Sequence, residues 1–260
     1  MISEISAGTN WKKYMLSANK VLLIATTFWM LPLCFVENRT LAEDKIHVLK
    51  INGAPDFELT GDGSSPQWGK AEWVDLPQRR EFGEAFSTRM KILYSATGIY
   101  FLFDCEDRRL TATLREDFLD LWNEDVVEVF LWTDESFPAY FEYELSPLNH
   151  ELPILVPNNK GDFWGWRPWH YQGSRLTRHM TSVQGGEKQS GAAIVGWMAE
   201  FFIPYDLLKP LGNVPPQSGT RWRANFYRCD YDSGQMATWE WQAIEFRFHE
   251  YEKFGTLIFE

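Results

Sequence analysis

Hydrophobic and polar residues alternate along most of this chain in short runs, and few segments show the spacing of an amphipathic helix. The strongest run covers residues 126–132, directly after a polar stretch at 123–125 that disfavours a strand. Successive strand side chains point to opposite faces of a sheet, so one face of this run is aliphatic: Val127, Val129 and Leu131. The other face carries Glu128, and Trp122 lies on the loop before the strand. This pairing would suit a sugar ring, whereas a Trp packed under its own loop beside a solvated Glu is the alternative.

A second strand, predicted over residues 140–146, has the same two-sided character. One face carries Phe141, Tyr143 and Leu145, and the other carries Tyr140, Glu142, Glu144 and Ser146. If the two strands pair antiparallel, their apolar faces merge into one core, and Glu128, Glu142 and Glu144 share the opposite face. Because like charges facing each other destabilise a sheet, these carboxylates need a cation such as structural calcium, basic side chains, or a hydroxyl-rich ligand. Simple solvation on an exposed face is the alternative.

Further β-type runs, separated by turn residues, continue to the end of the chain. We expect strands at 46–51, 88–94, 99–104, 175–183, 196–203, 222–229, 238–245 and 256–259, with the clearest hairpin turn at 95–98. Short helical segments are expected within 108–120 and at 205–208, and Trp68 should cap one end of the core. The Trp-rich loop at 158–173 is either a self-packed cover or a sugar platform. The pattern predicts an all-β fold, an antiparallel, jelly-roll-like β-sandwich with short helical turns.

The first 42 residues have a different character from the rest. Basic residues precede an apolar run at 21–36, which ends near the small-residue pattern Thr40-Leu41-Ala42. We predict a secretory signal peptide cleaved after Ala42, followed by one domain over 43–260. The protein would then be secreted, periplasmic or on the cell surface. The alternative is an uncleaved N-terminal anchor, which would be its contact with a membrane.

The net charge of the chain limits the classes of partner that it can bind. The formal net charge is −11, which argues against nucleic acid or an anionic membrane surface as partner and suits a neutral ligand. Two cysteines follow the predicted signal. Cys105 shares the apolar face of Phe101 and Phe103, so we expect a buried free thiol, with a disulfide to Cys229 as the alternative in an oxidising compartment.

Several short motifs follow one another in a distinctive order. A Trp after an Asp-Gly turn precedes a two-strand hairpin that ends in an acidic pair. Then come W-x-x-D-x-V-E-V-F from Trp122, a strand with Tyr and Glu, G-W-x-x-E-x-x-I-P from Gly196, and a closing K-F-G-x-L-x-F from Lys253. In this order and spacing the chain resembles the family 9 carbohydrate-binding module, known from xylan-degrading enzymes, over nearly all of residues 43–260.

The resemblance implies a β-sandwich that binds the end of a sugar chain between two aromatic side chains. Trp122 matches the first aromatic residue, Phe248 the second, and Glu128 a hydrogen-bonding carboxylate. The best-known members have Trp in place of Phe248, Arg in place of Glu144 and Gln in place of Tyr227, so the sugar specificity does not carry over. The implied partners are an oligosaccharide or polysaccharide and, beside it, glycan-degrading enzymes.

We therefore predict non-catalytic carbohydrate binding, with these site residues: Trp122, Glu128, Phe248, Glu142, Glu144 and Tyr227. A first alternative is a glycosidase-like enzyme whose paired Glu residues act as acid and base about 5 to 10 Å apart. A second is haem binding, as in distant sandwich relatives, with axial ligands from scattered histidines: His47, His150, His170, His179 and His249. The sequence implies no cofactor, and it leaves the question of a metal open.

Overall fold

The computed structural model describes residues 45–80, 84–159, 162–163 and 171–260. The predicted signal peptide and most of the Trp-rich loop lie outside the described residues. Within them, no helix has both the length and the apolar character of a membrane span.

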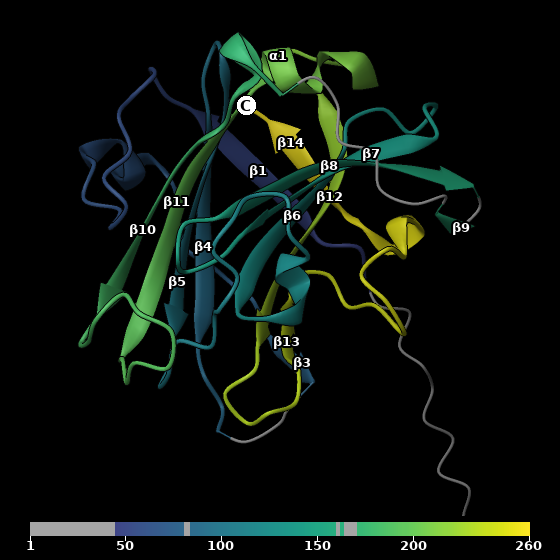
Figure 1. Ribbon diagram of the computed structural model, residues 1–260. Helices are drawn as coiled ribbons and strands as arrows, with labels where there is room; N and C mark the ends of the chain where they lie inside the picture. The colour runs from purple at the N-terminus through teal and green to yellow at the C-terminus, as the bar shows by residue number, and fades with distance from the viewer. Residues whose placement is uncertain (1–44, 81–83, 160–161, 164–170) are drawn as a thin grey trace, which may run out of the picture. The chain divides into compact units, whose positions relative to one another are not determined.

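Strands dominate the described chain, as predicted (Figure 1). The strands are β1 Val48–Gly53, β2 Val74–Asp75, β3 Gln78–Arg80, β4 Thr88–Tyr94, β5 Gly98–Glu106, β6 Val126–Trp132, β7 Ala139–Leu145, β8 Glu151–Asn159, β9 Asp162–Phe163, β10 Arg178–Gln184, β11 Gly196–Pro204, β12 Arg221–Asp230, β13 Ala237–Glu240 and β14 Gly255–Phe259. The short helix α1, Tyr205–Leu208, covers the predicted helical turn. Pro204 ends the preceding strand and stands at the N-cap of this helix.

The strands form two layers that meet at β1. The strand order is β10-β11-β5-β4-β1-β14-β12-β6-β7-β8-β9, and β13 pairs with β12 and β3. β1 runs parallel to both β4 and β14, whereas the other paired strands are antiparallel. In Figure 1, β4, β5, β10 and β11 run steeply together, and β6, β7, β8 and β12 cross beside them. The predicted all-β sandwich is therefore confirmed, with the addition of two parallel ladders at β1.

The core lies between the layers and contains the predicted aliphatic faces. These inward side chains are fully buried in one cluster: Val127, Val129, Leu131, Phe141, Tyr143 and Leu145. The register sets Val129 opposite Tyr143, as the antiparallel pairing of the two strands requires. Cys105 belongs to the same core, Cys229 belongs to a separate cluster, and both are free thiols. The buried free thiol predicted for Cys105 is present, and the alternative disulfide is not formed.

Several expectations were wrong in detail. Residues 108–120 contain no helix, and the chain forms the short 3-10 helix η2, Leu121–Asn123, only after them. Strand β8 was not predicted, because Pro153 and Pro157 within it disfavour a strand reading of the sequence. Trp68 is buried as expected, but in a smaller cluster on the outer face of β4 and β5 rather than at the end of the main core.

Candidate functional site

The outer face of β6, β7 and β12 carries a cavity of about 410 Å³. Alternate residues of these strands point away from the core, and loop 241–250 covers part of the same face. β6, β7 and β12 contribute Glu128, Phe130, Glu142 and Cys229 to the lining. β3 and β13 contribute Arg79, Arg80, Thr238 and Glu240. The connecting segments contribute Trp122, Met236 and residues 244–249. Most of these segments are far apart in the sequence, so the sandwich itself creates the cavity.

Four of the six predicted site residues line this cavity: Trp122, Glu128, Glu142 and Phe248. Tyr227 does not line it, because it is fully buried beneath Phe248. The two rings are stacked with centroids 4.0 Å apart and an interplanar angle of 8°. Glu144 is also fully buried and lies behind the carboxyl groups of the cavity floor. The structure therefore places Tyr227 as a support for Phe248.

Trp122 is held by the polar residues that follow it. It lies on η2, half-buried, and its carbonyl oxygen accepts a hydrogen bond from Tyr231 Oη at 2.7 Å. The buried Asp125 carboxylate accepts backbone N–H groups from Thr111 at 2.5 Å and Tyr231 at 2.9 Å. The polar stretch that disfavours a strand thus anchors the loop by side-chain to backbone hydrogen bonds.

Phe248 lies on a loop that is shaped by one carboxylate. Glu250 accepts backbone N–H groups from Glu245 at 2.9 Å, Phe246 at 2.6 Å and Arg247 at 3.0 Å. Burial would raise the pKa of Glu250, but these N–H groups outweigh it and hold the pKa below its usual value. Phe246 on the same loop is 81% exposed at the cavity rim. The loop therefore presents a half-buried ring and an exposed ring to the same cavity.

The cavity floor is acidic, and its carboxyl groups are buried. Glu128, Glu142 and Glu144 are at most 2% exposed, so the alternative of a solvated acidic face is wrong. Loop 241–250 and its neighbours cover this face, which strand alternation alone cannot reveal. One carboxyl oxygen from each residue lies within 4.8 Å of the others. We call Glu128, Glu142 and Glu144 the carboxyl triad.

Burial controls the ionisation of the triad. It raises the pKa of Glu128 to about 8, partly offset by the Cys229 thiol, which donates to Glu128 Oε1 at 3.8 Å. Burial also raises the pKa of Glu142 and of Glu144 well above the usual range. The charge of Glu128 raises both further, whereas a hydrogen bond with Glu144 acts in the opposite direction on the pKa of Glu142. In the absence of a cation, the triad therefore keeps protons near neutral pH.

Sequence reasoning missed the side of the cavity formed by β3 and β13. Glu240 is buried there and accepts hydrogen bonds from Thr238 Oγ1 at 3.1 Å and from the Ile244 backbone at 3.3 Å. Arg79 and Arg80 are exposed at the rim. Thr238 pairs with Arg80 across a ladder that joins distant segments, so no local pattern signals this wall.

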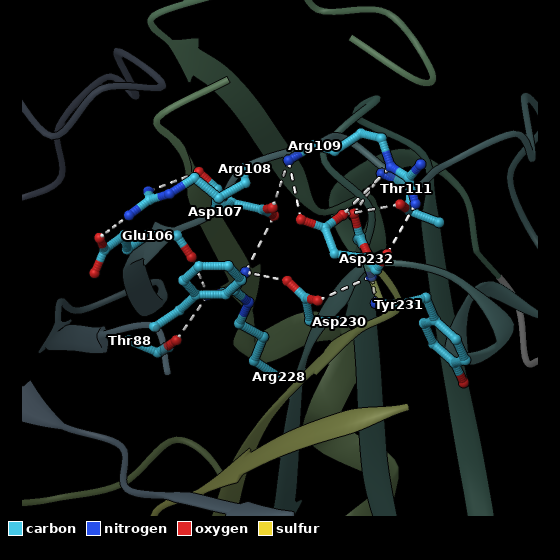
Figure 2. A network of polar contacts seen from close by, with 12 residues as sticks. Thr88, Glu106, Asp107, Arg108, Arg109, Thr111, Arg228, Asp230, Tyr231 and Asp232 are labelled. Atoms are coloured by element: carbon cyan, nitrogen blue, oxygen red, sulfur yellow. Dashed lines mark hydrogen bonds and ion pairs between the residues drawn. The ribbon is translucent and has the colours of Figure 1, made fainter. Parts of the chain in front are cut away.

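A second acidic cluster lies around Arg228 (Figure 2). Arg228 is completely buried, and its Nη2 lies 3.1 Å from Asp107 and 2.7 Å from Asp230. Its Nη1 donates to the Glu106 carbonyl at 2.6 Å and to Thr88 Oγ1 at 3.0 Å. Burial raises the pKa of Asp107 to about 7, although the Arg228 charge acts in the opposite direction. Arg228 thus supplies the cation that this cluster needs.

The remaining carboxylates of this cluster are also satisfied. Asp107, Asp125 and Asp232 have oxygens within 4.8 Å of one another, which is the spacing of metal ligands. However, Asp232 accepts from the Arg109 backbone at 3.0 Å and from Thr111 Oγ1 at 3.1 Å (Figure 2). Because backbone donors and a guanidinium already occupy these oxygens, the cluster fits a structural network rather than a metal centre.

Comparison with known structures supports this architecture. A putative carbohydrate-binding protein from Bacteroides uniformis has a TM-score of 0.67 and 15% identity, over 83% of this chain and 100% of that one. A family 9 carbohydrate-binding module from Caldicellulosiruptor kristjanssonii, solved in complex with cellotriose, has a TM-score of 0.59 and 14% identity, over 82% and 94%. Its complex with glucose gives a TM-score of 0.57 and 14% identity, over 81% and 95%. At these identities the similarity establishes the fold.

Sequence comparisons agree with the structural ones. An "Extracellular protein" from Arthroderma benhamiae is 23% identical over 158 residues, which are 59% of this chain. The match spans 66% of that protein, just under two thirds of its length. Residues 60–151 match the family described as carbohydrate family 9 binding domain-like. The matched residues include the segment from η1, Pro66–Lys70, through β7, and over this segment the chain is similar to that family.

Proposed function

We propose that this protein is a non-catalytic carbohydrate-binding protein that holds the end of a glycan between Trp122 and Phe248. The observation that carries the proposal is the cavity of about 410 Å³ that both aromatic residues line together with Glu128 and Glu142. This volume lies in the range of about 300–1,000 Å³ typical of small-molecule sites. Sugars with one or two residues in the cavity would match its size and its mixed lining.

The chemistry of the lining suits a neutral sugar. Aromatic faces pack on the C–H groups of a pyranose ring, and Phe246 adds a further exposed ring at the rim. Protonated carboxyl groups both donate and accept hydrogen bonds. The raised pKa of Glu128 and of Glu142 therefore allows each to match either polarity of a sugar hydroxyl.

The geometry of the triad favours binding over hydrolysis. Glycosidases hold their two carboxyl groups about 5–5.5 Å apart for retention and about 6.5–9.5 Å apart for inversion. One oxygen from each triad residue lies within 4.8 Å of the others, and burial raises the pKa of all three carboxyl groups together, so no member is set apart as an ionised base beside a protonated acid.

The natural partner is then an oligosaccharide or polysaccharide met outside the cytoplasm, where glycan-degrading enzymes also act. The predicted signal peptide and the extracellular description of the Arthroderma benhamiae relative support export. Cellulose-type and xylan-type chains are the first ligands to try, because the Caldicellulosiruptor kristjanssonii neighbour was solved with cellotriose.

Calorimetric titration against soluble oligosaccharides tests the proposal. If the Trp122 ring is an anchor, Trp122→Ala should cost about 1–3 kcal/mol of binding free energy, with little change in melting temperature. Trp73→Ala is the matched control, because Trp73 is half-buried on the other sheet, packed against the separate cluster around Trp68. Equal affinity of Trp122→Ala and wild type, together with a much lower melting temperature of the variant, would make Trp122 a core residue.

A further inference from the structure

The carboxyl triad continues below the cavity. Glu128 and Glu142 line the cavity floor, whereas Glu144 lies behind them and is 0% exposed. In the antiparallel register of β6 and β7, Glu128 stands directly opposite Glu144. The pairing therefore fixes three carboxyl groups around one point, reached from the cavity through Glu128 and Glu142.

The triad lacks the donors that satisfy buried acids elsewhere in this protein. Glu144 interacts with the Glu142 carboxyl group and the Trp122 backbone N–H, but within the described residues neither oxygen of Glu144 and not Oε2 of Glu142 forms a hydrogen bond of normal geometry. Glu200, equally buried, accepts from Trp68 Nε1 at 2.8 Å and from the backbone N–H groups of Thr60 at 2.8 Å and Gly61 at 2.6 Å. Buried polar groups without partners are costly and rare, so the unsatisfied oxygens of the triad indicate a missing ligand.

The basic group that approaches the triad does not compensate its charge. His249 Nδ1 lies 3.8 Å from Glu142 Oε2. The same nitrogen is hydrogen-bonded with Tyr140 Oη at 2.6 Å, so His249 is paired with Tyr140 rather than with Glu142. By contrast, the Asp107 cluster contains a buried guanidinium from Arg228 at 3.1 Å. A cation that arrives from solution would fill the corresponding place in the triad.

We propose that Glu128, Glu142 and Glu144 bind one divalent cation, Ca²⁺, at the floor of the cavity. Ca²⁺ takes about six to eight oxygen ligands in flexible geometry. Three carboxylates supply three to six oxygens and three negative charges without any nitrogen ligand. The remaining coordination positions face the cavity, because two of the three residues line it.

These open positions connect the ion to the ligand. Two neighbouring hydroxyls of a sugar could replace water there, so that the cation and the aromatic rings would hold the same residue of the glycan. This second step rests on the proposed carbohydrate-binding function, whereas the ion site itself does not. Because the triad carries protons in the absence of metal, binding of Ca²⁺ should also release protons.

The ion site is tested on the purified, chelator-treated protein. Calorimetry should show one equivalent of Ca²⁺ bound, with a heat that depends on the ionisation enthalpy of the buffer. Tb³⁺, a luminescent substitute for Ca²⁺, should be excited through tryptophan, because Trp122 lines the same cavity. Glu144→Gln should weaken Ca²⁺ binding by at least about tenfold, since ligand charge controls affinity at such sites. Glu187→Gln, at an exposed loop position, removes the same charge and should change nothing.

Melting curves recorded with and without Ca²⁺ distinguish an effect of the substitution on folding from an effect on metal binding. Glu144→Gln removes a buried carboxyl group, so in chelator its melting temperature should equal or exceed that of wild type, and added Ca²⁺ should raise it less. If this variant does not fold, Glu142→Gln provides the same comparison. Wild type that binds no Ca²⁺, a Glu144→Gln variant that binds it normally, or tighter binding of Zn²⁺ than of Ca²⁺ would overturn the proposal.

Two further results locate the ion and separate the hypotheses. Loss of Ca²⁺ binding in Asp232→Asn, with Glu144→Gln unaffected, would place the ion in the Arg228 cluster and refute the triad site. Glycan titrations with and without chelator show the coupling. Ca²⁺ binding without affinity for any glycan would overturn the proposed function and leave the ion site intact. Glycan binding without any Ca²⁺ binding would overturn the ion site and leave the proposed function intact.

Discussion

The ring of Phe248 lies flat on the ring of Tyr227, and Tyr227 Oη donates a hydrogen bond to the Phe248 carbonyl oxygen at 2.9 Å. Asn225 Nδ2 in turn donates to Tyr227 Oη at 2.7 Å. The rim residue that should contact the glycan is therefore oriented by a residue of β12 that never reaches the cavity. Tyr227 therefore holds Phe248 by two contacts, one with its ring and one with its backbone carbonyl.

Tyr227→Phe should loosen this support while keeping the stacked ring. Removal of the hydroxyl leaves the Phe248 carbonyl and the Asn225 amide short of one partner each, so we expect a loss of about 1–2 kcal/mol in the free energy of unfolding and weaker glycan binding. Chemical denaturation and calorimetry measure the two effects. Tyr205→Phe is the matched control, because the buried Tyr205 hydroxyl has no partner among the described residues. Similar losses in both variants would refute a specific role for Tyr227.

The Arg228 cluster makes a separate prediction about stability. Arg228→Met would leave Asp107 and Asp230 buried without their cation, and breaking such a pair costs about 3–5 kcal/mol. Arg89→Met removes a partly exposed pair with Asp104, at 46% and 23% side-chain exposure, and should cost less than about 1 kcal/mol. Urea titrations of both variants check the contrast. Equal stabilities would show that the buried network contributes no more than a surface pair.

Strand alternation predicted the faces of β6 and β7 because each strand has one face in a common core. The same rule placed Glu128 and Glu144 away from that core, and both do point away from it. Alternation could not show that these carboxyl groups are buried, because loop 241–250 covers them and its path depends on the carboxylate of Glu250. Local pattern gives the direction of a side chain, whereas its exposure depends on distant segments.

Family resemblance was informative where it concerned position and weaker where it concerned role. It selected Trp122 and Phe248, which line one cavity although they lie far apart in the chain. It also selected Tyr227 as a ligand contact, but the structure uses that position to support Phe248. Arg79, Arg80 and Glu240 escaped notice because the pairing of β3 with β13 brings them to the cavity.

The pH dependence of stability tests the ionisation of Glu128. Its pKa is about 8 in the folded protein and about 4.3 in an unfolded chain. A carboxyl group with a raised folded pKa stabilises the fold fully below its unfolded pKa, and this contribution is lost as the pH rises through the folded pKa.

In chelator, the melting temperature of wild type should therefore fall between about pH 4 and pH 8. Glu142, Glu144 and Asp107 contribute with the same sign, whereas His249, whose pKa is lowered to about 4, contributes with the opposite sign up to about pH 6.5. The carboxyl groups outnumber the imidazole, so Glu128→Gln should reduce the slope without removing it. Thermal melts across this range measure the effect, and a wild-type melting temperature that rises over the same range would contradict it. Added Ca²⁺ should flatten the slope of wild type, because the cation binds the ionised triad and therefore stabilises the fold most at the high-pH end of the series.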